Sequence, residues 1–128
     1  MVTSGQDFAC VLSALSALRL PLQQGEYDLH QKVMAALDGA GIPYQHEYPL
    51  APRCRIDLIC GREKNIGVEI KRGKVDTQRL RKQLERYAAC PEVSALIVVT
   101  EKTVPLPDTL LGKPLGRICL NRLWGIAL

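Results

Sequence analysis

Hydrophobic residues recur along this chain with two different periods, and the period predicts the type of each element. Residues 7–18 are apolar on nearly all sides, which predicts a helix packed against the domain or against a second subunit. Apolar residues spaced by three and four positions predict two more helices, from about Glu26 to Asp38 and from about Thr77 to Ala89. Asp76 is suited to cap the start of the last helix.

Four short runs rich in branched or aromatic residues predict strands, at residues 44–50, 55–59, 66–71 and 95–100. Pro49 and Pro52 are expected to end the first strand. A turn within the five residues before Ile66 is expected to join the second and third strands as a hairpin. The last run is apolar throughout, which predicts a strand buried on both faces, and the helix before it would place it parallel to a neighbour.

The order of these elements, α-α-β-β-β-α-β, predicts a single α/β domain over residues 1–128. A mixed central β-sheet flanked by helices is the natural way to pack such elements. We expect the core at about residues 26–100. A helical extension at 1–25 precedes this core, and a C-terminal decoration at 101–128 follows it.

The remaining segments limit the class of protein. Residues 105–114 are expected to form a loop, and residues 117–120 and 123–126 are left open between short strands and a helix. The uncharged run 8–18 is too short to span a bilayer and lacks a basic start, so neither a membrane span nor a signal peptide is expected. Five cysteines without a Cys-x-x-Cys pair predict neither a disulfide framework nor a zinc site, which suits a cytoplasmic location.

Acidic and basic residues on two of the predicted strands form the candidate site. Successive strand residues point to opposite faces, so Glu69 and Lys71 share one face of their strand. By the same alternation, Asp57 lies opposite Ile56 and Leu58 on the preceding strand of the hairpin. If the two strands are neighbours, two carboxylates and one ammonium group converge.

Such a convergence has a physical requirement. Two carboxylates about 4 Å apart repel one another by roughly 4 kcal/mol at an effective dielectric constant near 20. A divalent cation that prefers oxygen ligands, Mg²⁺ or Mn²⁺, removes this penalty and acidifies a bound water. A lysine beside it can orient the water or neutralise charge on a phosphate. The arrangement therefore predicts metal-assisted cleavage of a phosphodiester, and the alternative is a solvated surface ion pair.

Positive charge is concentrated around this candidate site. Residues 53–90 contain eleven Lys or Arg and five acids, a net charge of +6, whereas the rest of the chain has six basic and eight acidic residues. This distribution suits a polyanion such as nucleic acid, and the alternative is a solvated basic helix. The candidate nucleic-acid-binding residues are Arg55, Arg72, Lys74, Arg79, Lys82 and Arg86.

A helix, three strands carrying Asp57 and then Glu69-x-Lys71, a helix and a strand together resemble the PD-(D/E)XK nuclease superfamily over about residues 26–100. The resemblance implies a restriction-endonuclease-like core. It also implies that Asp57, Glu69 and the carbonyl of Ile70 bind Mg²⁺ or Mn²⁺, and that Lys71 is the catalytic lysine.

The same resemblance gives roles to residues outside the sheet. Members often carry an acid on the helix before the sheet, which implies that Glu26 is catalytic and an outer metal ligand, with His30 on the same helical face or an ordinary surface histidine. Many members place a glutamine near Gln-x-x-x-Tyr on the next helix, which implies that Gln83 holds a water or a phosphate and leaves Tyr87 in the core. Ile56 replaces the proline of the motif that names the superfamily, a position that varies among members.

These features predict a Mg²⁺-dependent deoxyribonuclease. No helix-turn-helix or zinc finger is recognisable, so DNA structure or a protein partner is expected to direct cleavage. A homodimer would allow two strands to be cut. The alternative is a non-catalytic module that keeps the fold and binds nucleic acid or an acidic protein. An enzyme of small metabolites finds no support, because neither a Gly-rich phosphate loop nor a nucleophile motif is recognisable.

Overall fold

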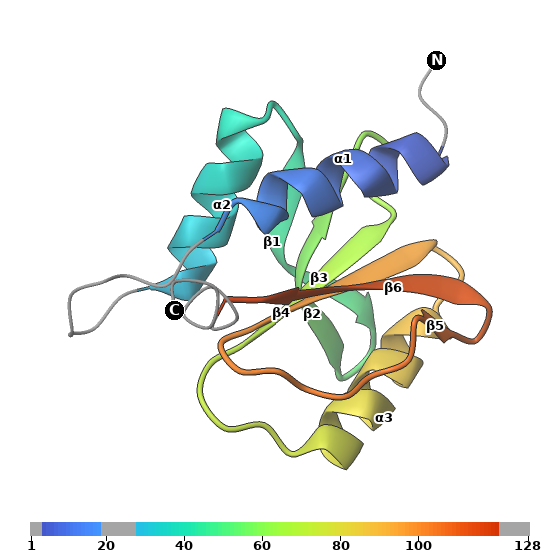
Figure 1. The fold of residues 1–128 in the computed structure, drawn as a ribbon. Coiled ribbons are helices and arrows are strands. Elements are labelled where there is room, and N and C mark those ends of the chain that lie inside the picture. Colours follow the sequence, from blue (N-terminus) through green and yellow to red (C-terminus); the bar gives the residue numbers. More distant parts are fainter. Residues whose placement is uncertain (1–3, 19–27, 121–128) are drawn as a thin grey trace.

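The computed structural model describes residues 4–18 and 28–120, which form three helices and six strands (Figure 1). The helices are α1 (Ser4–Ser16), α2 (Leu29–Gly39) and α3 (Thr77–Ala88). The strands are β1 (Tyr44–Ala51), β2 (Cys54–Cys60), β3 (Ile66–Lys71), β4 (Ala95–Thr100), β5 (Thr109–Leu110) and β6 (Lys113–Cys119). The predicted order of elements is confirmed as far as β4, and two further strands follow it.

All six strands belong to one mixed sheet in the order β1-β2-β3-β4-β6-β5. β1, β2 and β3 are antiparallel neighbours, whereas β3, β4 and β6 run parallel and β5 is antiparallel to β6. Helix α3 is the crossover between the parallel strands β3 and β4, as predicted. The chain is therefore an α/β protein with a mixed open sheet, which confirms the predicted class.

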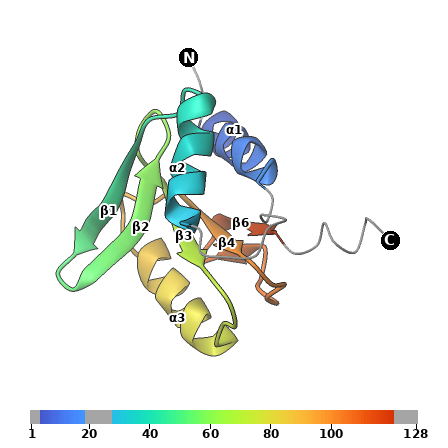
Figure 2. The same cartoon turned by 90° about the vertical axis from the view of Figure 1, so that its left-hand side faces the viewer.

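Helices cover both faces of this sheet (Figures 1 and 2). Helices α1 and α2 pack on one face, where Val11, Leu15 and Val33 are fully buried. Helix α3 packs on the other face and buries Leu80 and Leu84. Every residue of β4 is buried between the two layers, as its unbroken apolar sequence predicted. None of the described helices is long and apolar enough to cross a membrane.

Helix α1 packs against its own domain, one of the two alternatives predicted for it. It crosses β6 at close range, because a side-chain carbon added at Gly116 would lie 2.8 Å from Leu12 Cδ1 and 3.2 Å from Phe8 Cζ. In its first turn, the buried Asp7 Oδ2 accepts a hydrogen bond of 2.9 Å from the Arg62 amide of the β2–β3 turn. The helix is therefore fixed to the sheet by both apolar packing and a buried polar contact.

Helix α2 begins later than predicted. Asp28 is its N-cap and accepts a hydrogen bond of 3.2 Å from the Gln31 amide, so the first helical residue is Leu29. The predicted start at Glu26 is therefore wrong, and Glu26 itself lies outside the described residues. Helix α1 is also shifted from its prediction, by three residues at its start and two at its end.

Pro49 lies inside β1 instead of ending it. β1 is an edge strand that pairs only with β2, and an edge strand tolerates proline because one side has no ladder partner. The register between the two strands shifts between Pro49 and Ala51. The strand therefore ends at Ala51, one residue later than predicted, and Pro52 follows it in the tight turn as expected.

The loop predicted at residues 105–114 is wrong in part, because it contains β5 and the start of β6. β6 pairs in parallel with the buried strand β4, from Leu96 opposite Leu115 to Thr100 opposite Cys119. The sequence of β6 conceals this strand, since a proline and a glycine interrupt its apolar residues. The sequence leaves residues 117–120 open between a short strand and a helix, and residues 117–119 belong to β6; residues 123–126 lie outside the described residues.

Candidate active site

The β2–β3 hairpin opens at the level of Asp57 and Glu69. Backbone pairing reaches Leu58 opposite Val68, and side chains replace the ladder beyond that pair. The Asp57 amide donates to Glu69 Oε1 at 3.3 Å, and the Ile70 amide donates to Asp57 Oδ2 at 2.8 Å. Two carboxylates therefore lie between the strands, and each binds a backbone amide of the opposite strand.

The alternation of side chains along β2 breaks beside this opening. Ile56 packs in the cluster beneath α3, whereas Leu58 packs in the cluster beneath α1 and α2. The prediction that these two residues share a face opposite Asp57 is therefore wrong. Glu47 of β1 lies between their ladder partners and has a φ of 55°, so a local backbone distortion accompanies the break.

Glu69 is the buried member of the site, with 2% of its surface exposed. Its Oε2 lies 3.2 Å from Lys71 Nζ, on a side chain that is one-third exposed (33%). The pKa of Glu69 is raised to about 7, first by burial and then by the negative charge of Asp57, against the lowering effect of Lys71. The structure thus brings Asp57, Glu69 and Lys71 together, and Lys71 links the buried carboxylate to solvent.

Tyr87 of α3 also reaches this site, which the sequence did not suggest. Its side chain is buried, as expected for a core residue. Its hydroxyl oxygen lies 3.3 Å from Glu69 Oε2 and 3.0 Å from the carbonyl oxygen of Arg55. Either of these oxygens can accept the hydroxyl hydrogen. Gln83 Nε2 donates to the same hydroxyl at 2.9 Å, so Gln83 is linked to Glu69 through Tyr87. The Gln-x-x-x-Tyr spacing, which puts both side chains on one helical face, was the available signal.

Two histidines lie on the side of Asp57 that faces α2. His30 Nε2 lies 3.9 Å from Asp57 Oδ2, and its Nδ1 lies 3.0 Å from His46 Nε2 of β1. Proximity of His30 to the site was one of the alternatives drawn from the sequence, whereas His46 was not considered. Glu26, predicted as an outer metal ligand on the same helical face, lies outside the described residues.

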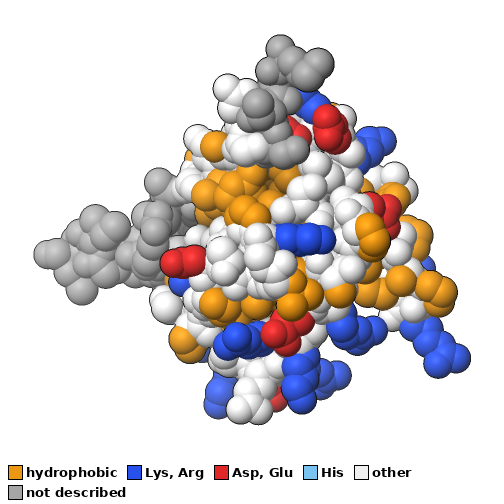
Figure 3. Space-filling view, turned by 90° about the vertical axis from the view of Figure 1, so that its right-hand side faces the viewer, with side chains coloured by type: hydrophobic (Ala, Val, Ile, Leu, Met, Phe, Trp, Pro, Cys, Tyr) orange, Lys and Arg blue, Asp and Glu red, His pale blue; other side chains and the backbone are white. Residues whose placement is uncertain are grey.

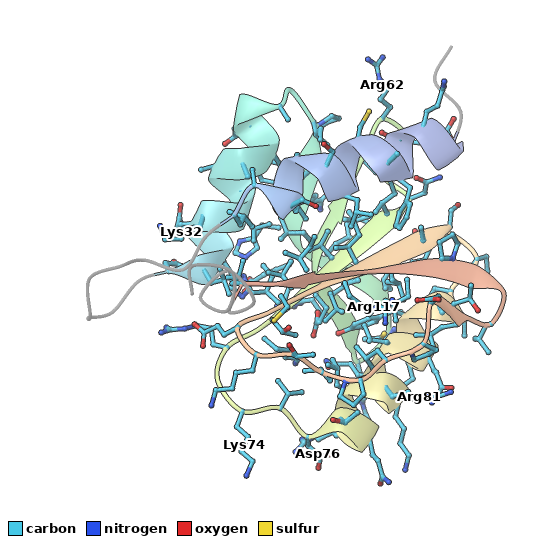
Figure 4. The ribbon with its side chains drawn as sticks, viewed as in Figure 1. Lys32, Arg62, Lys74, Asp76, Arg81 and Arg117 are labelled. Carbon is cyan, nitrogen blue, oxygen red and sulfur yellow. The ribbon has the colours of Figure 1, made fainter. Side chains whose placement is uncertain are left out.

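A groove of about 760 Å³ runs from the end of β3 along α3. Basic residues dominate its lining, and Figure 3 shows Lys and Arg side chains gathered toward the α3 end of one face of the molecule. Figure 4 shows Lys74 and Asp76 at this end and Arg62 at the opposite end. Lys71 opens into this groove, so the candidate site and the basic surface are continuous. The other lining residues are Arg72, Lys74, Val75, Asp76, Arg79, Leu80, Lys82, Gln83 and Arg86.

Five of the six predicted nucleic-acid-binding residues line this groove, and Arg55 does not. Arg55 is exposed on β2 and lines a separate hollow of about 390 Å³ near the β1–β2 turn. Asp76 caps α3 as predicted, accepting a hydrogen bond of 3.1 Å from the Arg79 amide. The capped helix therefore begins beside the groove and carries its basic residues along it.

Glu101, just beyond β4, holds the loop that leads from β3 to α3. Its Oε1 accepts a hydrogen bond of 2.7 Å from the Gly73 amide, and its Oε2 lies 3.4 Å from Arg72 Nε. Gly73 has a φ of 69°, a conformation that favours glycine. Glu101 therefore holds Arg72, which lines the groove, although nothing in the sequence around Glu101 indicated this contact.

Oxygen atoms for a metal are available at the site from two carboxylates, Asp57 and Glu69. In residues 4–18 and 28–120, no group of three or more His, Cys, Asp or Glu side chains is arranged to hold a metal ion. Ile70, predicted to contribute its carbonyl, is joined to Asp57 through its amide. A hard cation such as Mg²⁺ usually binds one or two protein carboxylates and keeps several waters, so this donor set suits Mg²⁺ better than a metal that needs a closed protein cage.

Comparisons with known proteins do not identify a relative. No family model, no curated protein and no solved structure matches this chain. The geometry of the site and its charge therefore carry the functional argument.

Proposed function

We propose that this chain is a metal-dependent nuclease that hydrolyses DNA phosphodiester bonds. The observation that carries the proposal is the meeting of Asp57, Glu69 and Lys71 at the mouth of a basic groove. A buried carboxylate beside a second, half-buried one is an unfavourable arrangement for stability alone, because burial and mutual repulsion penalise the charge of Glu69. The same arrangement is useful where a cation and a phosphate enter together.

We further propose that α2, β1, β2, β3, α3 and β4 form a restriction-endonuclease-like core of the PD-(D/E)XK type. The support is the order of these elements, with antiparallel pairing of β2 and β3 and parallel pairing of β3 and β4. The acids occupy the adjacent strands β2 and β3. In this reading, α1, β5 and β6 are additions to the core.

Mg²⁺ or Mn²⁺ is the cofactor that this proposal implies, with Asp57 and Glu69 as its ligands. The raised pKa of Glu69 supports the fit, because burial first and the charge of Asp57 second make the ionised carboxyl costly, and a divalent cation would offset that cost. The side chain of Asp57 is 26% exposed, so the pair is open to solvent on one side. Asp57 and Glu69 would hold such a metal, which when bound would lower the pKa of a water and withdraw charge from the phosphate.

The protein groups have separable roles in hydrolysis. A water oxygen bonds to phosphorus and gives up a proton to solvent, while the bond from phosphorus to the leaving sugar oxygen breaks and that oxygen takes a proton from solvent. Lys71 Nζ lies between Glu69 and the groove, where it neutralises charge that develops on a phosphate oxygen. Asp57 accepts hydrogen bonds from the attacking water and so orients it. Tyr87, held by Gln83, keeps Glu69 in place.

The groove favours contacts to the phosphate backbone. Six of its ten lining residues are Lys or Arg and one is acidic, and none is aromatic. Backbone contacts give affinity without reading sequence. We therefore propose that DNA structure, a DNA end or a protein partner selects the cleavage position, and that a homodimer is one arrangement that would cut two strands.

One observation favours the alternative, a non-catalytic module that binds nucleic acid. Glu69 is already satisfied by the Asp57 amide, Lys71 and Tyr87, and the Ile70 amide occupies Asp57 Oδ2. A site satisfied by its own protein groups can persist without a metal. Activity separates the two possibilities, because a binding module would hold DNA and leave it intact.

The decisive experiment is incubation of the protein with plasmid, linear duplex, single-stranded and branched DNA and with RNA, each in Mg²⁺, Mn²⁺ or EDTA. We expect DNA to be cut in Mg²⁺ or Mn²⁺ and not in EDTA, and Lys71→Ala to bind DNA without cutting it. Lys64→Ala is the matched control, because Lys64 is exposed on the β2–β3 turn away from the groove. Cleavage by Lys71→Ala at the rate of the Lys64→Ala control would remove Lys71 from the mechanism. DNA binding without cleavage by the parent would favour the module.

A further inference from the structure

The turn between β1 and β2 holds an arginine in a conformation that arginine rarely adopts. Ala51 pairs with Cys54, so Pro52 and Arg53 alone form the loop, and Arg53 has a φ of 60°. Proline followed by a residue of positive φ is the pattern of a type II turn, in which glycine is preferred at the second position. An arginine there costs about 1 kcal/mol relative to a relaxed conformation. Lys64 of the β2–β3 turn has a similar φ of 52°, so the charge and the neighbours of Arg53 carry the argument for its role.

This turn is part of the surface that surrounds the groove. Arg86 Nη2 donates to the Arg53 carbonyl at 3.4 Å, and the Tyr87 hydroxyl lies 3.0 Å from the Arg55 carbonyl. The start of β2 is therefore held against the C-terminal half of α3, and the hairpin projects beside that helix (Figure 2). Arg86 also lines the groove, so the basic surface continues from the groove to the turn.

The charged residues that line the hollow at the β1–β2 turn are all positive. Arg53 and Arg55 are both exposed, and they line the 390 Å³ hollow together with Pro49, Ala51 and Cys54. No acidic and no aromatic residue lines this hollow. A guanidinium matches a phosphate with two parallel hydrogen bonds, whereas a surface for single-stranded bases needs aromatic rings on which they stack.

We propose that Arg53 and Arg55 form a second contact to the phosphate backbone of duplex DNA, separate from the groove along α3. This inference rests on the proposed function, since it names how the same protein holds its substrate. Two basic surfaces on different elements suit a stiff polyanion that spans both. The hairpin tip thereby fixes the orientation of the duplex relative to Lys71.

The test compares two glycine substitutions that are matched in charge and backbone. Lys64 on the β2–β3 turn has a φ of 52° and is exposed, so Lys64→Gly removes one positive charge and one strained conformation, as Arg53→Gly does. The two turns lie at opposite ends of β2, about 20 Å apart for a strand of this length. Binding of a 30-base-pair duplex is followed by fluorescence anisotropy in EDTA over a range of salt concentrations, with urea unfolding of each variant.

We expect both variants to be as stable as the parent or more stable. Only Arg53→Gly should weaken duplex binding, by roughly threefold to tenfold, and lower the salt-dependence slope by about 0.9, as for one lost phosphate contact. Arg53→Gly with Arg55→Gln should lower the slope by about twice as much. The loss should be smaller for a 30-nucleotide single strand than for the duplex.

Other binding results would refute either the contact at the hairpin tip or the assignment of DNA to the groove. If Arg53→Gly binds like Lys64→Gly while Lys74→Ala with Lys82→Ala weakens binding, the tip contact is wrong and the proposed function stands. If none of these variants changes binding, the assignment of DNA to the groove is wrong as well. An equal loss of affinity for single-stranded and duplex DNA would refute the choice of duplex.

Discussion

Replacement of Glu69 by glutamine should make the metal-free protein more stable at alkaline pH. The pKa of Glu69 is raised from 4.5 to about 7 because the carboxyl is buried and faces Asp57. A folded-state pKa above the unfolded value means that the native protein binds the proton more tightly. Stability from this group is therefore complete below about pH 4.5, is lost as the pH rises through the interval up to about 7, and stays lost above it.

The size of the stabilisation by Glu69→Gln follows from how far the pKa of Glu69 is raised. A shift of about 2.5 units at roughly 1.36 kcal/mol per unit corresponds to about 3 kcal/mol at pH 8. Glutamine avoids the buried charge, but its amide has one acceptor oxygen, so it keeps the bond from the Asp57 amide or the contacts at Oε2 and not both. One lost hydrogen bond costs about 1 kcal/mol. The expected net gain is about 2 kcal/mol.

Urea unfolding in EDTA at pH 5 and pH 8 measures this gain. We expect Glu69→Gln to exceed the parent in free energy of unfolding by about 2 kcal/mol at pH 8 and by much less at pH 5. Glu63→Gln, on the exposed β2–β3 turn, is the control and should change little at either pH. A variant that is no more stable than the parent at pH 8, or a gain independent of pH, would refute the argument from burial and repulsion.

Three further predictions follow from other contacts. Mg²⁺ at ten times its dissociation constant should add about 1.4 kcal/mol to the stability of the parent in a thermal melt, and Asp57→Ala should lose this gain; an equal gain in both would place the metal elsewhere. Tyr87→Phe should cost about 1–2 kcal/mol and lower kcat about tenfold with little change in KM, because the Glu69 or the Arg55 oxygen loses its donor and Gln83 loses its acceptor; an unchanged kcat would contradict a positioning role. Asp7→Ala should cost about 1 kcal/mol in urea unfolding, since it leaves the Arg62 amide of the β2–β3 turn without its acceptor, and an unchanged midpoint would argue against this.

The hydrophobic periodicity of the sequence was sufficient to predict most of the helices and strands. The helical spacing around α3 and the unbroken apolar run of β4 predicted a crossover between parallel strands, which the structure confirms. The short turn before Ile66 predicted the β2–β3 hairpin and with it the approach of Asp57 to Glu69. These predictions succeed because helix and strand periodicity depends on neighbours within a few residues.

The positions of the side chains around the site could not be predicted from periodicity. Asp57 is placed by a break in alternation, and Tyr87 reaches Glu69 from α3. His46 contacts His30 beside the site, and Glu101 holds the loop after β3, both across long separations in the chain. β6 was missed because it becomes a strand through its pairing with β4, although proline and glycine interrupt its pattern. Contacts of this kind depend on the packing of whole layers.

The sequence by itself determined which acids and lysine could share a strand face and where positive charge gathers, since both are properties of neighbouring residues. Only the tertiary structure decided that the strands open to admit two carboxylates and that the basic groove ends beside Lys71. It also decided that the hairpin tip rests on α3. The physical reason is that burial and hydrogen-bond partners, which set the charge state and orientation of each group, come from residues far along the chain.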